Sequence, residues 1–137
     1  MKFLPTLIGF SMAFAGSAAA QVTVPETDIV LVAPSVEVEG YEPFDYAADP
    51  NLEVTLDDAD VYSSITGEDI GEVDDVHTIA ATGQTHLELE IGGFLDIGDK
   101  DVAVPLDQVS IYRGTDGYRV YIAATEEQLE SYPEFND

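Results

Sequence analysis

The chain of 137 residues contains no cysteine and no tryptophan, and it has only two histidines. Without cysteine there can be no disulfide, no thiolate nucleophile and no cysteine-ligated metal site. Small secreted domains often depend on disulfides because their cores are small, so a domain of this length must here be held together by packing alone. One domain is expected at this length, and the hydrophobic content of 45% is ordinary.

Basic residues are also scarce: four of them stand against 28 acidic residues, which gives a formal net charge of −24. Beyond residue 20 the basic residues are Lys100, Arg113 and Arg119. A negative field of this size repels phosphates and anionic lipid surfaces, so nucleic acid is excluded as a partner. A solvated acidic surface is the simplest interpretation, and weak binding of hard cations such as calcium is the alternative.

A long apolar run occurs only at the N-terminus, where Lys2 precedes the segment Phe3–Ala15 and small residues ending in Ala18-Ala19-Ala20 follow it. This is the pattern of a cleavable signal peptide. The run is shorter than the about 20 residues that a spanning helix needs, so stable membrane insertion is not expected. We predict removal of residues 1–20 and a periplasmic protein that begins at Gln21, with an uncleaved anchor as the alternative.

The next segment, residues 21–57, is acidic and rich in residues that break regular structure. Pro34, Gly40, Pro43 and Pro50 argue against a helix or a central strand there. Its one strand candidate is the apolar stretch Ile29–Ala33. We therefore predict an extended N-terminal arm that is partly ordered against the domain.

From residue 58 onward, short β-strands alternate with turns. Asp60–Ser63 and the strands from Ile70 to Ile79 flank a turn in which Gly67 can adopt a positive φ. Residues 86–91 alternate in polarity, which predicts that Leu89 points inward and that Glu88 and Glu90 point into solvent. Several short strands at this spacing predict an all-β fold, a closed or nearly closed small barrel.

A hairpin can be registered around the loop Gly114-Thr115-Asp116-Gly117. This register pairs Tyr112 with Arg119 and Ile111 with Val120, because a slip by one residue would place the aliphatic residues in water. Thr125, with Gln128 in the capping-box position, then begins a short helix that is bounded by Pro133. The face of the hairpin turned to the core carries Val109, Ile111, Val120 and Ile122, and the opposite face carries Ser110, Tyr112, Arg119 and Tyr121.

Two sequence blocks carry a family resemblance. The glycine-punctuated stretch Gly92–Pro105 is the specific block, and Asp60–Val76 accompanies it. Together they resemble the PRC-barrel family, small β-barrels named after the photosynthetic reaction centre H subunit, and most of all its exported single-barrel members in Gram-negative bacteria. Asp96 stands where the family pattern more often has glycine. The resemblance implies a docking or assembly module without common catalytic residues and without a cofactor.

The layout that follows is a signal peptide at 1–20, the acidic arm at 21–57, a PRC-type barrel at 58–124, and a short C-terminal helix with its tail at 125–137. We expect an exported, non-catalytic docking or assembly protein with an unidentified protein partner, and a homo-oligomer stays open. A calcium-buffering role is the alternative. A hydrolase is a distant one, because no catalytic motif surrounds His77 or His86.

Acidic residues gather around the signature loop in a way that superficially suggests a metal site. Counted from Asp96, however, the third, fifth and sixth positions of an EF-hand are occupied by Gly98, Lys100 and Asp101, which do not fit that motif. No metal site is therefore predicted. The weak candidates are Asp96, Asp99, Asp101 and Asp107.

The predicted docking residues lie on the outer face of the hairpin and beside it. They combine tyrosine and arginine, which dominate interface hot spots, at the basic spot of an acidic surface. The face could hold an external partner, or it could hold the protein's own acidic arm or its tail, and the sequence leaves both interpretations open. The predicted partner-binding residues are Tyr112, Arg113, Arg119 and Tyr121.

Overall fold

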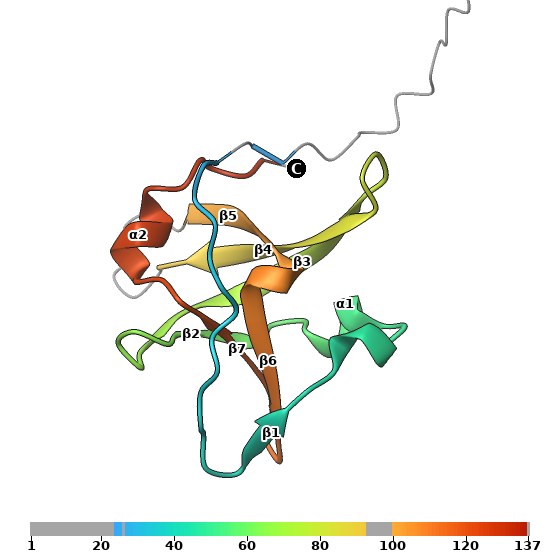
Figure 1. The fold of residues 1–137 in the computed structure, drawn as a ribbon, viewed down its shortest axis with the longest axis vertical. Helices are drawn as coiled ribbons and strands as arrows, with labels where there is room; N and C mark the ends of the chain where they lie inside the picture. The colour runs from blue at the N-terminus through green and yellow to red at the C-terminus, as the bar shows by residue number, and fades with distance from the viewer. Residues whose placement is uncertain (1–23, 26, 93–99, 137) are drawn as a thin grey trace, which may run out of the picture.

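The computed structural model describes residues 24–25, 27–92 and 100–136, and it shows a strongly curved sheet flanked by short helical segments (Figure 1). The predicted signal peptide and the candidates Asp96 and Asp99 lie outside these residues. None of the helices in this part of the chain has the length and apolar character that a membrane crossing requires. The elements in chain order are β1 (Tyr41–Pro43), η1 (Tyr46–Ala48), α1 (Leu52–Thr55), β2 (Asp60–Ser63), β3 (Asp69–Ile79), β4 (Gln84–Ile91), β5 (Lys100–Pro105), η2 (Leu106–Gln108), β6 (Val109–Gly114), β7 (Gly117–Ile122) and α2 (Glu126–Glu130).

The strands form one seven-stranded sheet in the order β1-β6-β7-β2-β3-β4-β5. All neighbouring strands are antiparallel except β2 and β7, which run parallel to each other. The β6–β7 hairpin therefore packs beside β2, far earlier in the chain, and β1 and β5 are the edges. The predicted all-β class and the short C-terminal helix are confirmed.

Aliphatic side chains fill the inside of the curved sheet. Leu89 is fully buried, and the β6–β7 register pairs Tyr112 with Arg119 and Ile111 with Val120, as the alternation predicted. The capping box of Thr125 and Gln128 at the start of α2 is also present. The largest fully buried aliphatic side chains of the core belong to Leu56, Val61, Ile70, Val73, Leu87, Leu89, Ile91, Val102, Val104, Val109, Ile122 and Leu129.

Two glycines have a steric role in the β2–β3 region. Gly67 has a φ of +76°, which confirms the predicted turn between the two strands. Gly71 on β3 lies so close to β4 that an added Cβ would stand 2.1 Å from the Glu90 carbonyl oxygen. The close approach of β3 to β4 at this point therefore requires a residue without a side chain.

The polar face of β4 differs from its prediction. Glu88 is 2% exposed and His86 is 7% exposed, and Glu90 is half-buried, so the expectation that Glu88 and Glu90 lie in solvent is wrong. The reason is tertiary: the chain after α2 returns over this side of the barrel. There the Phe135 N–H donates to the Asp101 carbonyl oxygen over 2.7 Å, and the Phe135 ring stacks on His77 at 5.1 Å.

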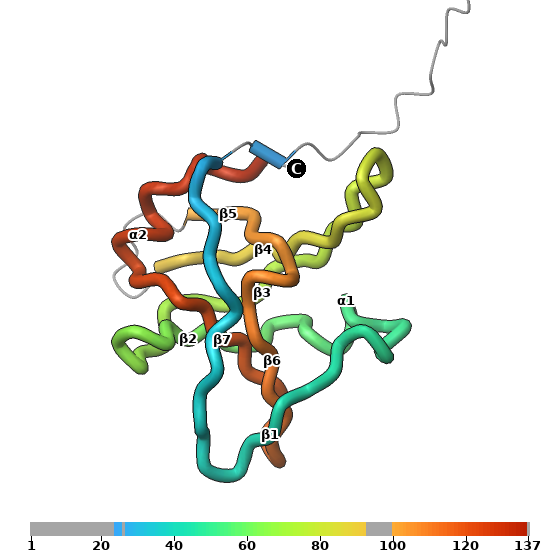
Figure 2. Tube along the Cα trace, viewed as in Figure 1, coloured from blue at the N-terminus to red at the C-terminus, as the bar shows by residue number. Residues whose placement is uncertain are grey.

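The N-terminal arm also departs from its prediction in detail. Ile29–Ala33 forms no strand, whereas Leu52–Thr55 forms a helical turn. The arm nevertheless runs extended from residue 27 to residue 39 across the front of the barrel (Figure 2). Among the described residues of the arm, only Tyr41–Pro43 pairs as a strand, with the edge of β6. Upstream of β1, the arm's backbone bonds to side chains of the barrel, and a strand ladder cannot form from such contacts.

Candidate docking face

The outer side of the β6–β7 hairpin continues onto β2. Tyr121 pairs with Ser110 of β6 on one side and with Tyr62 of the parallel strand β2 on the other. Directly opposed residues share a face, so this register gathers aromatic and cationic side chains there. We call this surface the tyrosine–arginine face, and it consists of Tyr62, Ser110, Tyr112, Arg119 and Tyr121.

Arg119 stands at the centre of this face between two aromatic rings. Its guanidinium carbon lies 4.3 Å from the centre of the Tyr41 ring and 4.6 Å from that of Tyr62. Cation–π contacts of this geometry stabilise a guanidinium that has lost part of its water. Arg119 also donates a hydrogen bond to the Tyr121 hydroxyl at 3.4 Å. This bond is the main cause of a raised Arg119 pKa, against burial, which lowers it.

The tyrosines pack against one another around Arg119. Tyr62 and Tyr121 stack with ring centres 5.4 Å apart, and Tyr112 meets Tyr121 edge to face at the same distance. Burial is the main cause that raises the pKa of Tyr62, and nearby Arg119 opposes it. The cluster is therefore a rigid aromatic platform that holds a permanent positive charge.

The arm lies on this platform. The Val36 N–H donates to the Tyr112 hydroxyl over 2.9 Å, and the Leu31 N–H donates to the Gln108 side-chain oxygen over 3.1 Å. The Ser110 hydroxyl donates to the Pro34 carbonyl oxygen. These bonds join residues more than 70 positions apart in the chain. The platform thus binds the arm largely through its backbone.

The side chains of the arm alternate between the platform and solvent. Half-buried positions are Pro34, Val36 and Val38, whereas Ser35, Glu37 and Glu39, each directly after one of them, are exposed. The acidic side chains of this part of the arm therefore point away from the arginine. Apolar packing and backbone hydrogen bonds hold the segment on the platform, and charge contributes little to this binding.

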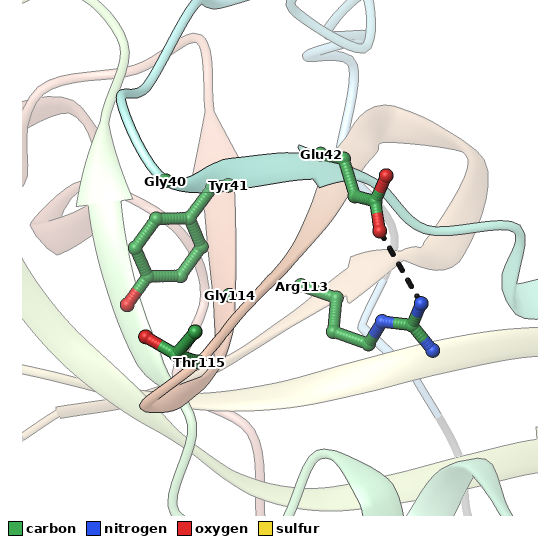
Figure 3. A pocket seen from close by; sticks show the side chains of 6 residues that line it. All are labelled: Gly40, Tyr41, Glu42, Arg113, Gly114 and Thr115. Atoms are coloured by element: carbon green, nitrogen blue, oxygen red, sulfur yellow. Dashed lines mark hydrogen bonds and ion pairs between the residues drawn. The ribbon is translucent and has the colours of Figure 1, made fainter.

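The extended part of the arm leads into β1, where a shallow hollow lies beside the hairpin loop (Figure 3). Glu42 and Arg113 form an ion pair across it at 3.3 Å, but both side chains are exposed, so the pair contributes little to stability. The Tyr41 ring packs on Gly114, where an added Cβ would lie 2.5 Å from the ring. Gly114 thus makes room for the aromatic ring that covers Arg119.

The predicted docking residues are placed as follows. Tyr112 and Tyr121 are 4% and 6% exposed because the arm and the neighbouring rings cover them, and Arg119 is half-buried. Arg113 is exposed on the hairpin edge. The sequence did not point to Tyr41 and Tyr62, because their place beside Arg119 depends on the β1–β6 and β2–β7 pairings, which no local pattern specifies.

Of the four weak metal candidates, the structure describes Asp101 and Asp107, and it places them in different surroundings. Asp107 is exposed in η2, whereas Asp101 on β5 has a carboxylate oxygen close to those of Asp74 and Glu88. Proximity to Asp74 and Glu88 was not foreseen, because it follows from the β3–β4–β5 register.

The described residues form one curved seven-stranded sheet with an aromatic platform on its outer side and without a preformed deep cleft. The model of the PRC-barrel domain matches residues 54–129, which is more than half of the chain. The chain belongs to the PRC-barrel family. No curated protein matches it.

Proposed function

We propose that this protein is an exported, non-catalytic docking module of the bacterial envelope, and that its docking surface is the tyrosine–arginine face. A protein partner displaces the arm and binds as an extended segment in its place. The partner inserts apolar side chains between the tyrosines and donates backbone hydrogen bonds to the Tyr112 hydroxyl and the Gln108 amide.

One observation carries this proposal: the face already binds an extended peptide, its own arm. The contacts are sequence-tolerant, because backbone groups of residues 31–36 make them and the acidic side chains Glu37 and Glu39 point outward. Buried tyrosines around an arginine are the composition of an interface centre. The segment of the arm from Leu31 to Val38, whose side chains are no more than half-buried, can be exchanged at small cost in buried area.

A disulfide can test whether release of β1, which carries the Tyr41 ring over Arg119, is required. Glu42 and Arg113 are Cα partners across β1 and β6, both are exposed, and the chain has no other cysteine. Directly opposed antiparallel residues lie at a separation that a disulfide can span. In a crosslinking pull-down with the full chain, the oxidised Glu42→Cys/Arg113→Cys variant should lose the partner that the unmodified protein recovers.

The reduced form of the same variant is the matched control and should recover the partner. Arg119→Gln should also lose it while keeping its urea unfolding midpoint close to that of the unmodified protein. Recovery of the same partner by the oxidised variant and by Arg119→Gln would show that this face is not the docking surface.

Export is tested separately by mass spectrometry of the protein from the periplasmic fraction. The signal-peptide pattern before Gln21 predicts a mature N-terminus at that residue. A periplasmic protein that retains Met1, or a protein confined to the cytoplasm, would contradict the proposed location.

A further inference from the structure

A second cluster of side chains lies outside the tyrosine–arginine face, on strands β3 and β4. Asp75 and Glu88 are direct cross-strand partners, and His77 follows two residues later on β3. The His77 Nε2 atom lies 2.8 Å from Glu88 Oε1 and 3.8 Å from Asp75 Oδ2. One possible ligand atom from each of the three residues lies within 4.8 Å of the others.

An irregularity in β3 adds further oxygens to this cluster. The register between β3 and β4 shifts between Val73 and Asp75, so Asp74 is an extra residue without a direct partner. In a regular strand, consecutive side chains point to opposite faces. Here Asp74 and Asp75 each place a carboxylate oxygen within 4.8 Å of Glu88, and Asp101 of β5 joins the group that contains Asp74. The bulge thus concentrates donor atoms around a buried carboxylate.

An independent feature of the same face is a buried nitrogen without a partner. His86 is the direct cross-strand partner of His77, and it stands two residues before Glu88, so it belongs to this face. It is 7% exposed, and its Nδ1 atom makes no hydrogen bond. A buried polar atom of this kind calls for a ligand or a water held there. A water molecule bound to an ion beside His77 would give the His86 Nδ1 atom a hydrogen-bond partner.

We propose that Asp75, His77 and Glu88 bind one divalent ion of the zinc type, with Asp74 and Asp101 as adjacent carboxylates. Imidazole nitrogen with carboxylate oxygen is a donor set of first-row transition metals, whereas calcium and magnesium prefer oxygen alone. Bonds of about 2.0–2.1 Å in tetrahedral geometry place ligand atoms roughly 3.3 Å apart. The two histidine distances, 2.8 Å and 3.8 Å, bracket that value, so side-chain shifts of a fraction of an ångström suffice.

Access to the ion leads past Asp75. The Asp75 side chain is 38% exposed, whereas Phe135 stacks on the His77 ring and the C-terminal chain covers the side near Asp101. The ion takes the place of the proton in the hydrogen bond between His77 and Glu88. The Nε2 atom must therefore be deprotonated, so that its lone pair can bind the ion. This site is independent of the tyrosine–arginine face, and partner docking and ion binding can be tested separately.

Calorimetric titration of the chelator-treated full chain with zinc chloride tests the site. We expect one saturable site per chain, and a rise in melting temperature with zinc because the ion binds the folded state. His77→Ala and Asp75→Asn should each weaken binding at least tenfold. Asp75→Asn is the safer variant, since this half-exposed side chain can change without emptying the core.

Two control variants distinguish the site from general adsorption to an acidic surface. Asp107→Asn, at an exposed carboxylate outside the cluster, and the double variant Asp96→Asn/Asp99→Asn should leave zinc affinity unchanged. The proposal is overturned by the absence of saturable zinc binding, by binding that Asp75→Asn and His77→Ala do not weaken, by binding lost in the Asp96/Asp99 variant instead, or by calcium binding more tightly than zinc.

Discussion

The two outer sides of the barrel are both covered by a terminal segment, but by different means. The N-terminal arm covers the tyrosine–arginine face of β6 and β7, and its residues from Leu31 to Val38 are half-buried or exposed. Helix α2 and the chain after it cover the side of β4 and β5, and there Leu129, Tyr132 and Phe135 are buried. The N-terminal arm therefore lies on the surface of the barrel like a bound peptide, whereas the C-terminal segment contributes buried side chains to the core.

This difference teaches where the molecule can open. Burial of large apolar side chains stabilises a segment far more than a few hydrogen bonds at the surface do. The tail should therefore unfold only with the whole domain. The arm, in contrast, should detach from the barrel in local openings whose free energy is well below the global free energy of unfolding. A docking role fits the side covered by the arm, and a buried ion fits the side sealed by the tail.

The largest expected contrast between the two segments comes from one truncation in each. Phe135→Ala should lower the free energy of unfolding by about 3 kcal/mol, because it empties a buried aromatic position and uncovers His77. Val36→Ala, at a half-buried arm position, should cost less than about 1 kcal/mol. Urea unfolding measures both values, and equal losses would contradict the distinction between arm and tail.

The ion pairs of the two sides should differ nearly as much. Glu88→Ala should cost about 3 kcal/mol, because it leaves His77 without its buried partner. Glu42→Ala removes the exposed partner of Arg113 and should cost less than about 1 kcal/mol. The same urea experiment compares them. If Glu88→Ala lowered the free energy of unfolding as little as Glu42→Ala does, the C-terminal tail would not exclude water from the side of β4 and β5 in solution.

A smaller effect should appear with pH on β3, which lies between the two covered sides in the order of the sheet. Burial is the main cause that raises the pKa of Asp69 and of Glu72, and nearby carboxylates such as Asp60 add to it. The folded protein then binds protons more tightly than the unfolded chain, whose carboxyls have pKa values of about 4. The melting temperature should therefore rise as pH falls from neutral through the raised folded-state pKa values.

Glu72→Gln should reduce this gain, since the amide does not titrate, and Glu68→Gln on the exposed turn should leave it unchanged. Melting curves between neutral pH and pH 5 measure the effect. Stability that falls steadily over this interval in the unmodified protein would show that other carboxylates, favourably paired in the folded state, dominate its titration.

The smallest effect concerns the anchor of the arm itself. Gly114→Ala places a Cβ against the Tyr41 ring, so the ring must move off the hairpin and away from Arg119. We expect a loss of about 1 kcal/mol, the low end for overpacking, because a side chain can shift more easily than backbone. Limited proteolysis should cut the arm faster, with Thr115→Ala as the control. Unchanged protection of the arm would show that Tyr41 does not anchor it.

Local patterns predicted much of the barrel. The β6–β7 register, the inward face of β4 at Leu89, the turn at Gly67 and the capping box at Thr125 were all predicted, because each depends on residues a few positions apart. The prediction of a strand at Ile29–Ala33 was wrong, because apolar composition favours a strand only where the edge of another strand is free to pair. In the structure the arm's hydrogen bonds go to side chains instead.

In the candidate sites too, the sequence predicted what depends on neighbouring residues and missed what depends on distant segments. The sequence placed Tyr112, Arg119 and Tyr121 on one outer face, because alternation in a hairpin determines which side chains share a side. It could not place Tyr41 and Tyr62 on either side of Arg119, since a parallel pairing of β2 with β7 joins segments nearly 60 residues apart. Nor could it bring Asp74, Glu88 and Asp101 together.

By itself, the sequence determined the class of this protein and the two sides of β4, β6 and β7, because alternation and turn chemistry act over a few residues. Only the tertiary structure decided what those outer sides face. Glu88 alternates like a solvent-exposed residue, and it is buried because Phe135 returns to the barrel from the far end of the chain. Burial of an outer face depends on segments distant in sequence, and no local period records where they will pack.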